Sequence, residues 1–271
     1  MALKKSELYS DIWKACDQLR GGMDASQYKD YILVLLFVKY VSDKYDKESN
    51  PFSPIKIPKG KEPGEGGSFG DMLFYDGKDN IGDQINKIIG RLAEANGLKG
   101  VIDITDFNDK TKLGDGKAMV DRLSGLLAIF NKPEFDFSNN RAEGDDLLGD
   151  AYEYLMKNFA VQSGKSKGQF YTPAEVSRIM SKVLGINKAD NTTQSVYDPT
   201  CGSGSLLIKA ANEAPIAISV FGQEIDISMT GLAKMNMILH GITTAEIHQG
   251  NTLSSPQFKK DESSLLTFDF A

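Results

Sequence analysis

The residues with the clearest potential for chemistry form a glycine loop, residues 198–205, which reads Asp-Pro-Thr-Cys-Gly-Ser-Gly-Ser. The loop follows a β-branched and aromatic run, Ser195–Tyr197, and precedes an apolar segment, Leu206–Ala211. In this order of strand, loop and helix, backbone N–H groups and a helix N-terminus face a bound ligand. A lone Gly-x-Gly is a weak signal, but the Asp-Pro before it and the strand on its correct side strengthen it. The pattern therefore predicts a ligand-binding loop.

Polar residues after two further predicted strands indicate that the ligand is a nucleoside. Residues 216–221 are strand-like and lead into Gly-Gln-Glu, where the Glu224 carboxylate can accept hydrogen bonds from both hydroxyls of a ribose. Asn251 follows a third strand candidate and could contact an adenine edge or serve only as a turn residue. Leu207 stands where the dinucleotide pattern Gly-x-Gly-x-x-Gly has its third glycine. The sequence thus favours an adenosine ligand without phosphates over a pyrophosphate-bearing dinucleotide.

A third segment, residues 168–173, reads Gly-Gln-Phe-Tyr-Thr-Pro and stands before an apolar helical pattern. Thr172 as N-cap, Pro173 at the first helical position and Glu175 as reciprocal partner are typical of a capping box. The Phe-Tyr pair before the cap could cover a ligand, or the segment could be no more than a well-capped helix start.

The type of secondary structure predicted for the chain changes near residue 162. Helical periodicity recurs before it, and strands alternate with helices after a flexible basic stretch, residues 162–168. Such alternation predicts an α/β domain with a mainly parallel, doubly wound sheet. We therefore expect a helical N-terminal domain over residues 1–162 and an α/β domain over residues 163–271. The expected helices cover 8–19, 25–45, 81 to near 97, 119–130, 147–159, 173–184, 205–212 and 227–240, and the expected strands 196–197, 216–221, 245–248 and 266–270.

Composition and charge limit the possible classes of protein. The longest apolar run, residues 31–38, is far shorter than the ~20 residues of a membrane span. Two cysteines, Cys16 and Cys201, are too few for a disulfide framework, and neither histidine stands in a metal-ligand cluster. We expect a cytoplasmic protein without a metal site or membrane contact. The net charge of −6 opposes binding to phosphates, so any DNA contact should depend on a local basic patch or a partner.

Four segments together, residues 168–173, 198–206, 222–226 and 250–253, resemble in order and spacing the S-adenosylmethionine site of adenine-N6 DNA methyltransferases. More closely, the chain resembles the modification (M) subunit of type I restriction–modification systems. The first half is similar to that subunit's N-terminal domain, notably in Arg20–Asp24. The resemblance implies a helical N-terminal domain followed by a Rossmann-like, S-adenosylmethionine-dependent methyltransferase domain, truncated after about the fourth strand.

The same resemblance implies roles for single residues. Aromatic and polar side chains before the first α/β helix would line the cofactor, and the glycine loop would form the floor beside its methionine part. Glu224 would hold the ribose hydroxyls, Ile225 would pack on the adenine, and Cys201 would be a small filler rather than a nucleophile. The cofactor-binding residues implied in this way are Gln169, Phe170, Tyr171, Thr172, Asp198, Thr200, Cys201, Gly202, Ser203, Gly204, Glu224, Ile225 and Asn251.

One departure from the family pattern concerns catalysis. The family's catalytic motif, Asn/Asp-Pro-Pro-Tyr/Phe, follows the fourth strand and contacts the extruded target base. The sequence contains no Pro-Pro pair, and Thr267–Ala271 resembles the strand that leads into the motif. We therefore expect a truncated chain that is inactive alone, with the catalytic residues just beyond Ala271.

The resemblance implies methyl transfer from S-adenosylmethionine to adenine N6 in DNA. The target would be read by a separate specificity subunit, a restriction subunit would join the assembly, and double-stranded DNA would be contacted mainly through the complex. One alternative is a non-catalytic module for cofactor binding and subunit assembly. Others are a related methyltransferase acting on protein glutamine or RNA and, less favoured without the third glycine, a nicotinamide-dependent dehydrogenase.

Overall fold

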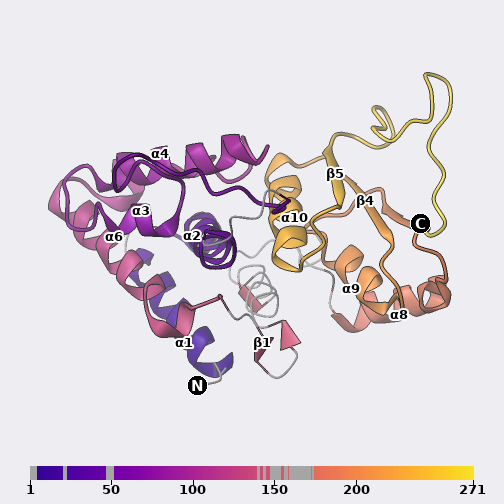
Figure 1. Cartoon of the computed structure of the whole chain (residues 1–271), viewed down its shortest axis with the longest axis horizontal. Coiled ribbons are helices and arrows are strands. Elements are labelled where there is room, and N and C mark those ends of the chain that lie inside the picture. The colour runs from indigo at the N-terminus through magenta and orange to yellow at the C-terminus, as the bar shows by residue number, and fades with distance from the viewer. Residues whose placement is uncertain are drawn as a thin grey trace. The chain divides into compact units, whose positions relative to one another are not determined.

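The chain forms two compact units, Met1–Leu155 and Met156–Ala271, in the computed structural model (Figure 1). The residues described are 5–20, 23–46, 52–138, 141–142, 145–146, 154–155, 158, 172 and 174–271. The domain boundary expected between residues 162 and 163 lies outside this set and stays a prediction. Each unit has its own apolar core.

The first unit is built around one buried helix, α2, as the sequence predicts. Every residue of α2 from Tyr31 to Val38 is buried, because α1 and α6 both pack against this helix. No helix in the described ranges is both long and apolar enough to cross a membrane. The main helices of this unit are α1 (Lys5–Leu19), α2 (Ala25–Tyr45), α4 (Ile81–Ala95) and α6 (Lys117–Phe130).

Several short elements of the first unit were not predicted, because each is set by caps and contacts rather than by periodicity. One begins at a capping box in which Ser68 Oγ accepts from the Asp71 N–H and Asp71 accepts from the Ser68 N–H. The N–H of Phe69 donates to Ser42 Oγ on α2 at 2.7 Å, which anchors this short helix to the core. The short elements are α3 (Phe69–Leu73), α5 (Lys110–Leu113), η1 (Pro133–Phe135) and the antiparallel pair β1 (Arg141–Ala142) and β2 (Asp145–Asp146).

The helix expected over residues 147–159 lies mostly outside the described residues. Three of its positions are described, Tyr154, Leu155 and Asn158, and all three are helical. Tyr154 stacks on Tyr9 with ring centroids 4.2 Å apart, and its hydroxyl accepts a hydrogen bond from Trp13 Nε1 at 2.8 Å. These contacts fasten the end of the first unit to α1.

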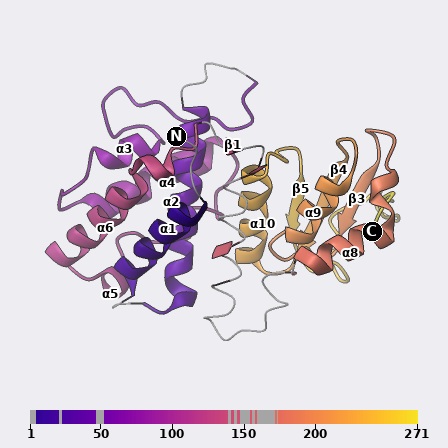
Figure 2. The same cartoon turned by 90° about the horizontal axis from the view of Figure 1, so that it is seen from below.

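The second unit contains a parallel sheet with strand order β3-β4-β5 (Figure 2). The predicted parallel α/β domain is therefore confirmed, but the strand expected over 266–270 is reduced to one parallel bridge between Phe270 and Val196. The strands are β3 (Ser195–Asp198), β4 (Ser219–Glu224) and β5 (Glu246–Gln249), and the helices are α8 (Ala174–Leu184), η3 (Ile186–Lys188), α9 (Ser205–Glu213) and α10 (Ile227–Leu239).

Helices α9 and α10 cover the same face of this sheet, which differs from the doubly wound arrangement that the sequence suggested. Leu207 and Met237, one from each helix, belong to one buried cluster with Val220 of β4. The reason is topological, since two successive right-handed crossovers in one direction place their helices on one side. The other face carries Tyr197 and Phe221, whose rings pack against Phe258 and Phe268 from the last segment.

Two glycines of α4 offer a matched test of packing in the first unit. A Cβ added at Gly82 would overlap the backbone carbonyl of Phe107, whereas a Cβ at Gly90 meets nothing within 4 Å. We expect Gly82→Ala to lower the free energy of unfolding by about 1–3 kcal/mol through overpacking. Gly90→Ala should raise it by roughly 0.5–1 kcal/mol, because alanine favours the helix. Urea denaturation of both variants measures the difference, and equal effects would contradict the packing of α4 on residue 107.

Candidate cofactor site

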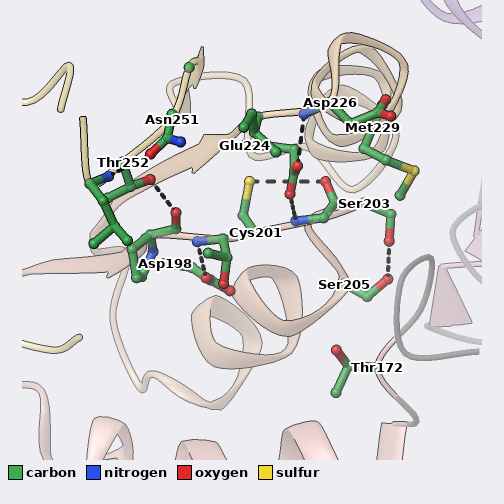
Figure 3. Close-up of a pocket in the computed structure, with 16 residues that line it drawn as sticks. Thr172, Asp198, Cys201, Ser203, Ser205, Glu224, Asp226, Met229, Asn251 and Thr252 are labelled. Atoms are coloured by element: carbon green, nitrogen blue, oxygen red, sulfur yellow. Dashed lines mark hydrogen bonds between the residues drawn. The ribbon is translucent and has the colours of Figure 1, made fainter. Parts of the chain in front are cut away.

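A pocket opens at the carboxyl ends of β3, β4 and β5, where parallel strands deliver their following loops to one edge of the sheet (Figure 3). Its volume is about 640 Å³, within the range of small-molecule sites. Residues of the loops after all three strands line it, together with Thr172 before α8. The pocket is therefore built from segments that lie far apart in the sequence.

The glycine loop after β3 needs its glycines for two different reasons. Gly202 and Gly204 have φ values of 53° and 78°, in the left-handed region that L side chains rarely adopt. A Cβ on Gly204 would also approach Met237 Cε of α10 to 2.8 Å. Asn236 of the same helix donates from Nδ2 to the Ser203 carbonyl at 3.0 Å. Helix α10 thus holds the loop in a tight turn at the start of α9.

Glu224, the last residue of β4, joins this loop to the start of α10. One carboxylate oxygen accepts from the Gly202 N–H at 2.9 Å, and the other accepts from the Asp226 N–H at 2.9 Å (Figure 3). Asp226 in turn caps α10 by accepting from the Met229 N–H. A carboxylate offers about four acceptor positions, so each oxygen keeps capacity for a ligand hydroxyl.

Three carboxylates, those of Asp198, Glu224 and Asp226, line the pocket. Burial raises the pKa of Asp198 above its ordinary value, and the nearby Glu224 charge raises it further, whereas the hydrogen bond from the Thr200 N–H acts in the opposite direction. Two like charges in a partly desolvated site favour a ligand that carries positive charge. The pocket is therefore suited to a cation.

Cys201 lines the pocket but does not have the surroundings of a nucleophile. Its side chain is buried, and burial together with the charges of Asp198 and Glu224 raises the pKa of the thiol. A reactive cysteine needs the reverse, an electropositive and accessible setting that stabilises the thiolate. Across the residues that the structure describes, no group of three or more potential ligands could hold a metal ion.

The loop after β5 is tied to both of the other loops. Asn251 Oδ1 accepts from the N–H groups of Leu253 and Ser254 at 2.9 and 3.1 Å, which forms a local turn. Thr252 Oγ1 donates to the Pro199 carbonyl at 2.5 Å, and the Gly250 N–H donates to the Glu224 carbonyl at 2.8 Å. These hydrogen bonds set the width of the pocket between the loops.

The structure brings most of the predicted site residues together around one pocket. Gln169, Phe170 and Tyr171 lie outside the described residues, and Gly204 lies behind the pocket wall against α10. The predicted residues that line the pocket are Thr172, Asp198, Thr200, Cys201, Gly202, Ser203, Glu224, Ile225 and Asn251. Lining residues that the sequence analysis did not select are Pro199, Ser205, Asp226, Met229, Gly250, Thr252 and Leu253.

Some of the missed residues carried a recognisable signal. Asp226 stands two residues after the predicted ribose carboxylate and directly before a helical pattern, which is typical of an N-cap. Thr252 and Gly250 flank the selected Asn251. Met229 carried no such signal, because only the packing of α10 turns it towards the pocket.

The fold and this pocket define an α/β domain of the methyltransferase type, and comparisons with known proteins give the same class. A model described as "N-6 DNA Methylase" matches residues 143–269, and one described as "HsdM N-terminal domain" matches residues 8–130. A methyltransferase subunit of a type I restriction–modification system from Streptococcus thermophilus has a TM-score of 0.76 and 26% identity, over 96% of this chain and 61% of that one. The chain belongs to the family of methylase subunits of type I restriction enzymes, which confirms the resemblance predicted from its motifs.

Two relatives illustrate the extent of the similarity. The type I restriction enzyme MpnII methylase subunit of Mycoplasma pneumoniae is 32% identical, over 92% of this chain and 53% of the relative. The MjaVII methylase subunit of Methanocaldococcus jannaschii is 31% identical, over 95% of this chain and 45% of the relative. The chain thus spans about half the length of the curated relatives that it matches.

We expect Asp198→Asn to stabilise the ligand-free chain at neutral pH. Because the folded protein raises the pKa of Asp198, ionising this side chain lowers the free energy of unfolding as the pH rises from the ordinary value, 3.8, through the raised value. Asparagine keeps an oxygen that can accept the Thr200 N–H. Melting temperatures at about pH 4.5 and about pH 7.5 should show a gain for the variant that is larger at the higher pH. A variant less stable than the wild type at the higher pH would refute this account.

Proposed function

We propose that this chain holds S-adenosylmethionine for the methylation of adenine N6 in double-stranded DNA, as part of a type I restriction–modification complex. The observation that carries the proposal is the Glu224 carboxylate at the end of β4, hydrogen-bonded to the glycine loop and facing the pocket. Family membership supports the reaction class, and the strand-end position of Glu224 is that of a ribose-binding acid.

The donor and acceptor set of the pocket fits this cofactor part by part. Glu224 would accept hydrogen bonds from the ribose hydroxyls through the acceptor positions that Gly202 and Asp226 leave open. Ile225 is 60% exposed beside the pocket, where it can pack on a planar base. Asn251 would contact the adenine edge. Gln169, Phe170, Tyr171 and Thr172 are proposed to complete the methionine side.

Charge supports the same assignment. S-adenosylmethionine carries positive charge on its sulfonium and ammonium groups, and when bound it supplies an electrophilic methyl group. Asp198 and Glu224 give the pocket a negative potential that attracts such a ligand. We propose that Asp198, with Thr200, Cys201, Gly202, Ser203 and Gly204, forms the floor beside the methionine part.

The partners are proposed from the family and from charge. The names of the relatives identify them as methylase subunits of type I restriction enzymes. We propose that a specificity subunit reads the DNA target and that a restriction subunit joins the same assembly. A net charge of −6 supports DNA contact mainly through the complex, since this charge opposes phosphate binding by the chain alone.

A second candidate function is a non-catalytic module for cofactor binding and subunit assembly. Turnover separates the two functions, whereas both require the cofactor pocket. A methyltransferase acting on protein glutamine or RNA is less well supported, because the family matched is a DNA methylase.

We expect Glu224→Gln to weaken the binding of S-adenosylmethionine by roughly 10- to 100-fold, because hydrogen bonds to an ionised carboxylate are lost. Isothermal titration calorimetry measures the dissociation constant. Glu246→Gln on β5 is the matched control, since its side chain is exposed and does not line the pocket. The ribose assignment is wrong if the two variants bind with the same affinity.

The chain of these 271 residues is expected to bind S-adenosylmethionine without transferring its methyl group to DNA. Transfer of a tritiated methyl group to duplex DNA should require a polypeptide that contains the Asn/Asp-Pro-Pro-Tyr/Phe motif, supplied with the specificity subunit. The reason is that an acceptor for the target amino group is needed beside the extruded base. Methylation by the chain alone would show that other residues replace this motif.

A further inference from the structure

Gln223, the residue before Glu224, is a fully buried amide in a strand, and both polar atoms of its side chain form hydrogen bonds. Its side chain is 0% exposed. Nε2 donates to the Ser255 carbonyl at 3.0 Å, and Oε1 accepts from the Gln257 N–H at 3.0 Å. A buried amide is costly without partners, so a glutamine in this position is stabilised only by the segment that it binds.

The same residue also contacts the loop on the other side of the pocket. Its backbone carbonyl accepts from the Cys201 N–H at 3.0 Å, within the glycine loop. Its side chain holds the loop after β5, residues 250–257. One residue of β4 therefore connects the two loops that face each other across the pocket.

A short chain of hydrogen bonds leads from Gln223 to Asn251. Ser255, whose carbonyl accepts from Gln223, donates its own N–H to the Asn251 carbonyl at 2.7 Å. Gly250 leaves room for this arrangement, because a Cβ there would lie 3.2 Å from Gln223 Nε2. The position of Asn251 is thus set from the interior of the sheet.

Asn251 has a defined hydrogen-bonding direction in this loop. Its Oδ1 is occupied by the N–H groups of Leu253 and Ser254, and Figure 3 shows its amide nitrogen on the side of Glu224. The amide therefore offers a donor, Nδ2, to a base in the pocket. Adenine presents an unprotonated ring nitrogen, N1, as an acceptor, whereas hypoxanthine carries a hydrogen on N1 and offers a donor there.

We propose that Gln223 is a positioning residue that sets the selectivity of the pocket for adenine over hypoxanthine by holding the loop of Asn251. This inference rests on the proposed cofactor site. Gln223 does not touch the ligand, and it acts through Ser255. Without the Gln223 Nε2 donor, the Ser255 carbonyl keeps only a donor from its own loop, Gln257 Nε2 at 3.0 Å, and its link to β4 is lost. The Nδ2 donor of Asn251 is then no longer held against the base.

The test compares two ligands and three proteins. S-adenosylhomocysteine and S-inosylhomocysteine differ in the base alone, and calorimetry gives both dissociation constants. The wild type should prefer the adenosyl ligand by roughly tenfold or more, since the wrong base places a donor against a donor. Gln223→Met, which keeps the volume and removes both hydrogen bonds, should reduce the preference to roughly threefold or less.

The matched control is Gln194→Met. Gln194 Oε1 accepts from the Asp190 and Asn191 N–H groups, so this variant also removes two hydrogen bonds to a loop. That loop lies before β3, at the opposite end of the strand from the pocket. Both variants should lower the melting temperature, but the control should keep the wild-type preference. A loss of ligand preference in Gln223→Met but not in Gln194→Met therefore cannot be explained by a general loss of stability.

A preference that is unchanged in Gln223→Met would overturn the inference. If that variant does not fold, Gln223→Glu replaces it, because it keeps the length and one acceptor oxygen and places a carboxylate oxygen, in place of the Nε2 donor, against the Ser255 carbonyl. The same loss of preference is expected, and an unchanged preference would again overturn the inference. Failure of the wild type to bind either ligand would instead refute the proposed cofactor site.

Discussion

The Glu224 carboxylate accepts hydrogen bonds from two backbone N–H groups, that of Gly202 in the loop after β3 and that of Asp226 at the start of α10. The loops of the pocket depend on this end of β4, because the neighbouring Gln223 holds the loop after β5 by donating to the Ser255 carbonyl and accepting from the Gln257 N–H. The contacts of Glu224 and Gln223 both require parallel strands in register, since this arrangement brings the carboxyl ends of β3, β4 and β5 to one edge of the sheet. The pocket is consequently organised by a central strand whose last two side chains reach outwards to the loops beside it.

Two carboxylates of the pocket, those of Asp198 and Glu224, lower the stability of the folded chain. Burial raises the pKa of Asp198, and the nearby charge of Glu224 raises it further. A site arranged only for stability would pair these carboxylates with a cation from the protein. Functional sites often accept such a loss of stability because the ligand restores it on binding. Under the proposed function, a cationic cofactor would offset the repulsion between these two carboxylates when it binds.

The two units follow different structural rules. The first surrounds a single helix, α2, whose residues Tyr31 to Val38 are buried on all sides, and its short elements are held by caps such as Ser68 with Asp71. The second gathers its core between one sheet face and α9 and α10, with Leu207 and Met237 in the same cluster. Each unit has its own core and is matched by its own family model, as expected of separate domains.

The sequence by itself determined the elements and the order of the chemical groups along them. Local periodicity encodes helices and strands, so the change from helices to alternating strands, the glycine loop and the end of β4 at Glu224 could be predicted. The roles of Gln223 and Asn236 could not, because the hydrogen-bond partner of each side chain lies more than 30 residues away. The single-sided sheet and the raised pKa of Asp198 also depend on the folded chain. The contacts between loops and the desolvation of charged groups depend on the tertiary structure, because only the strand register of the folded sheet brings these distant segments together.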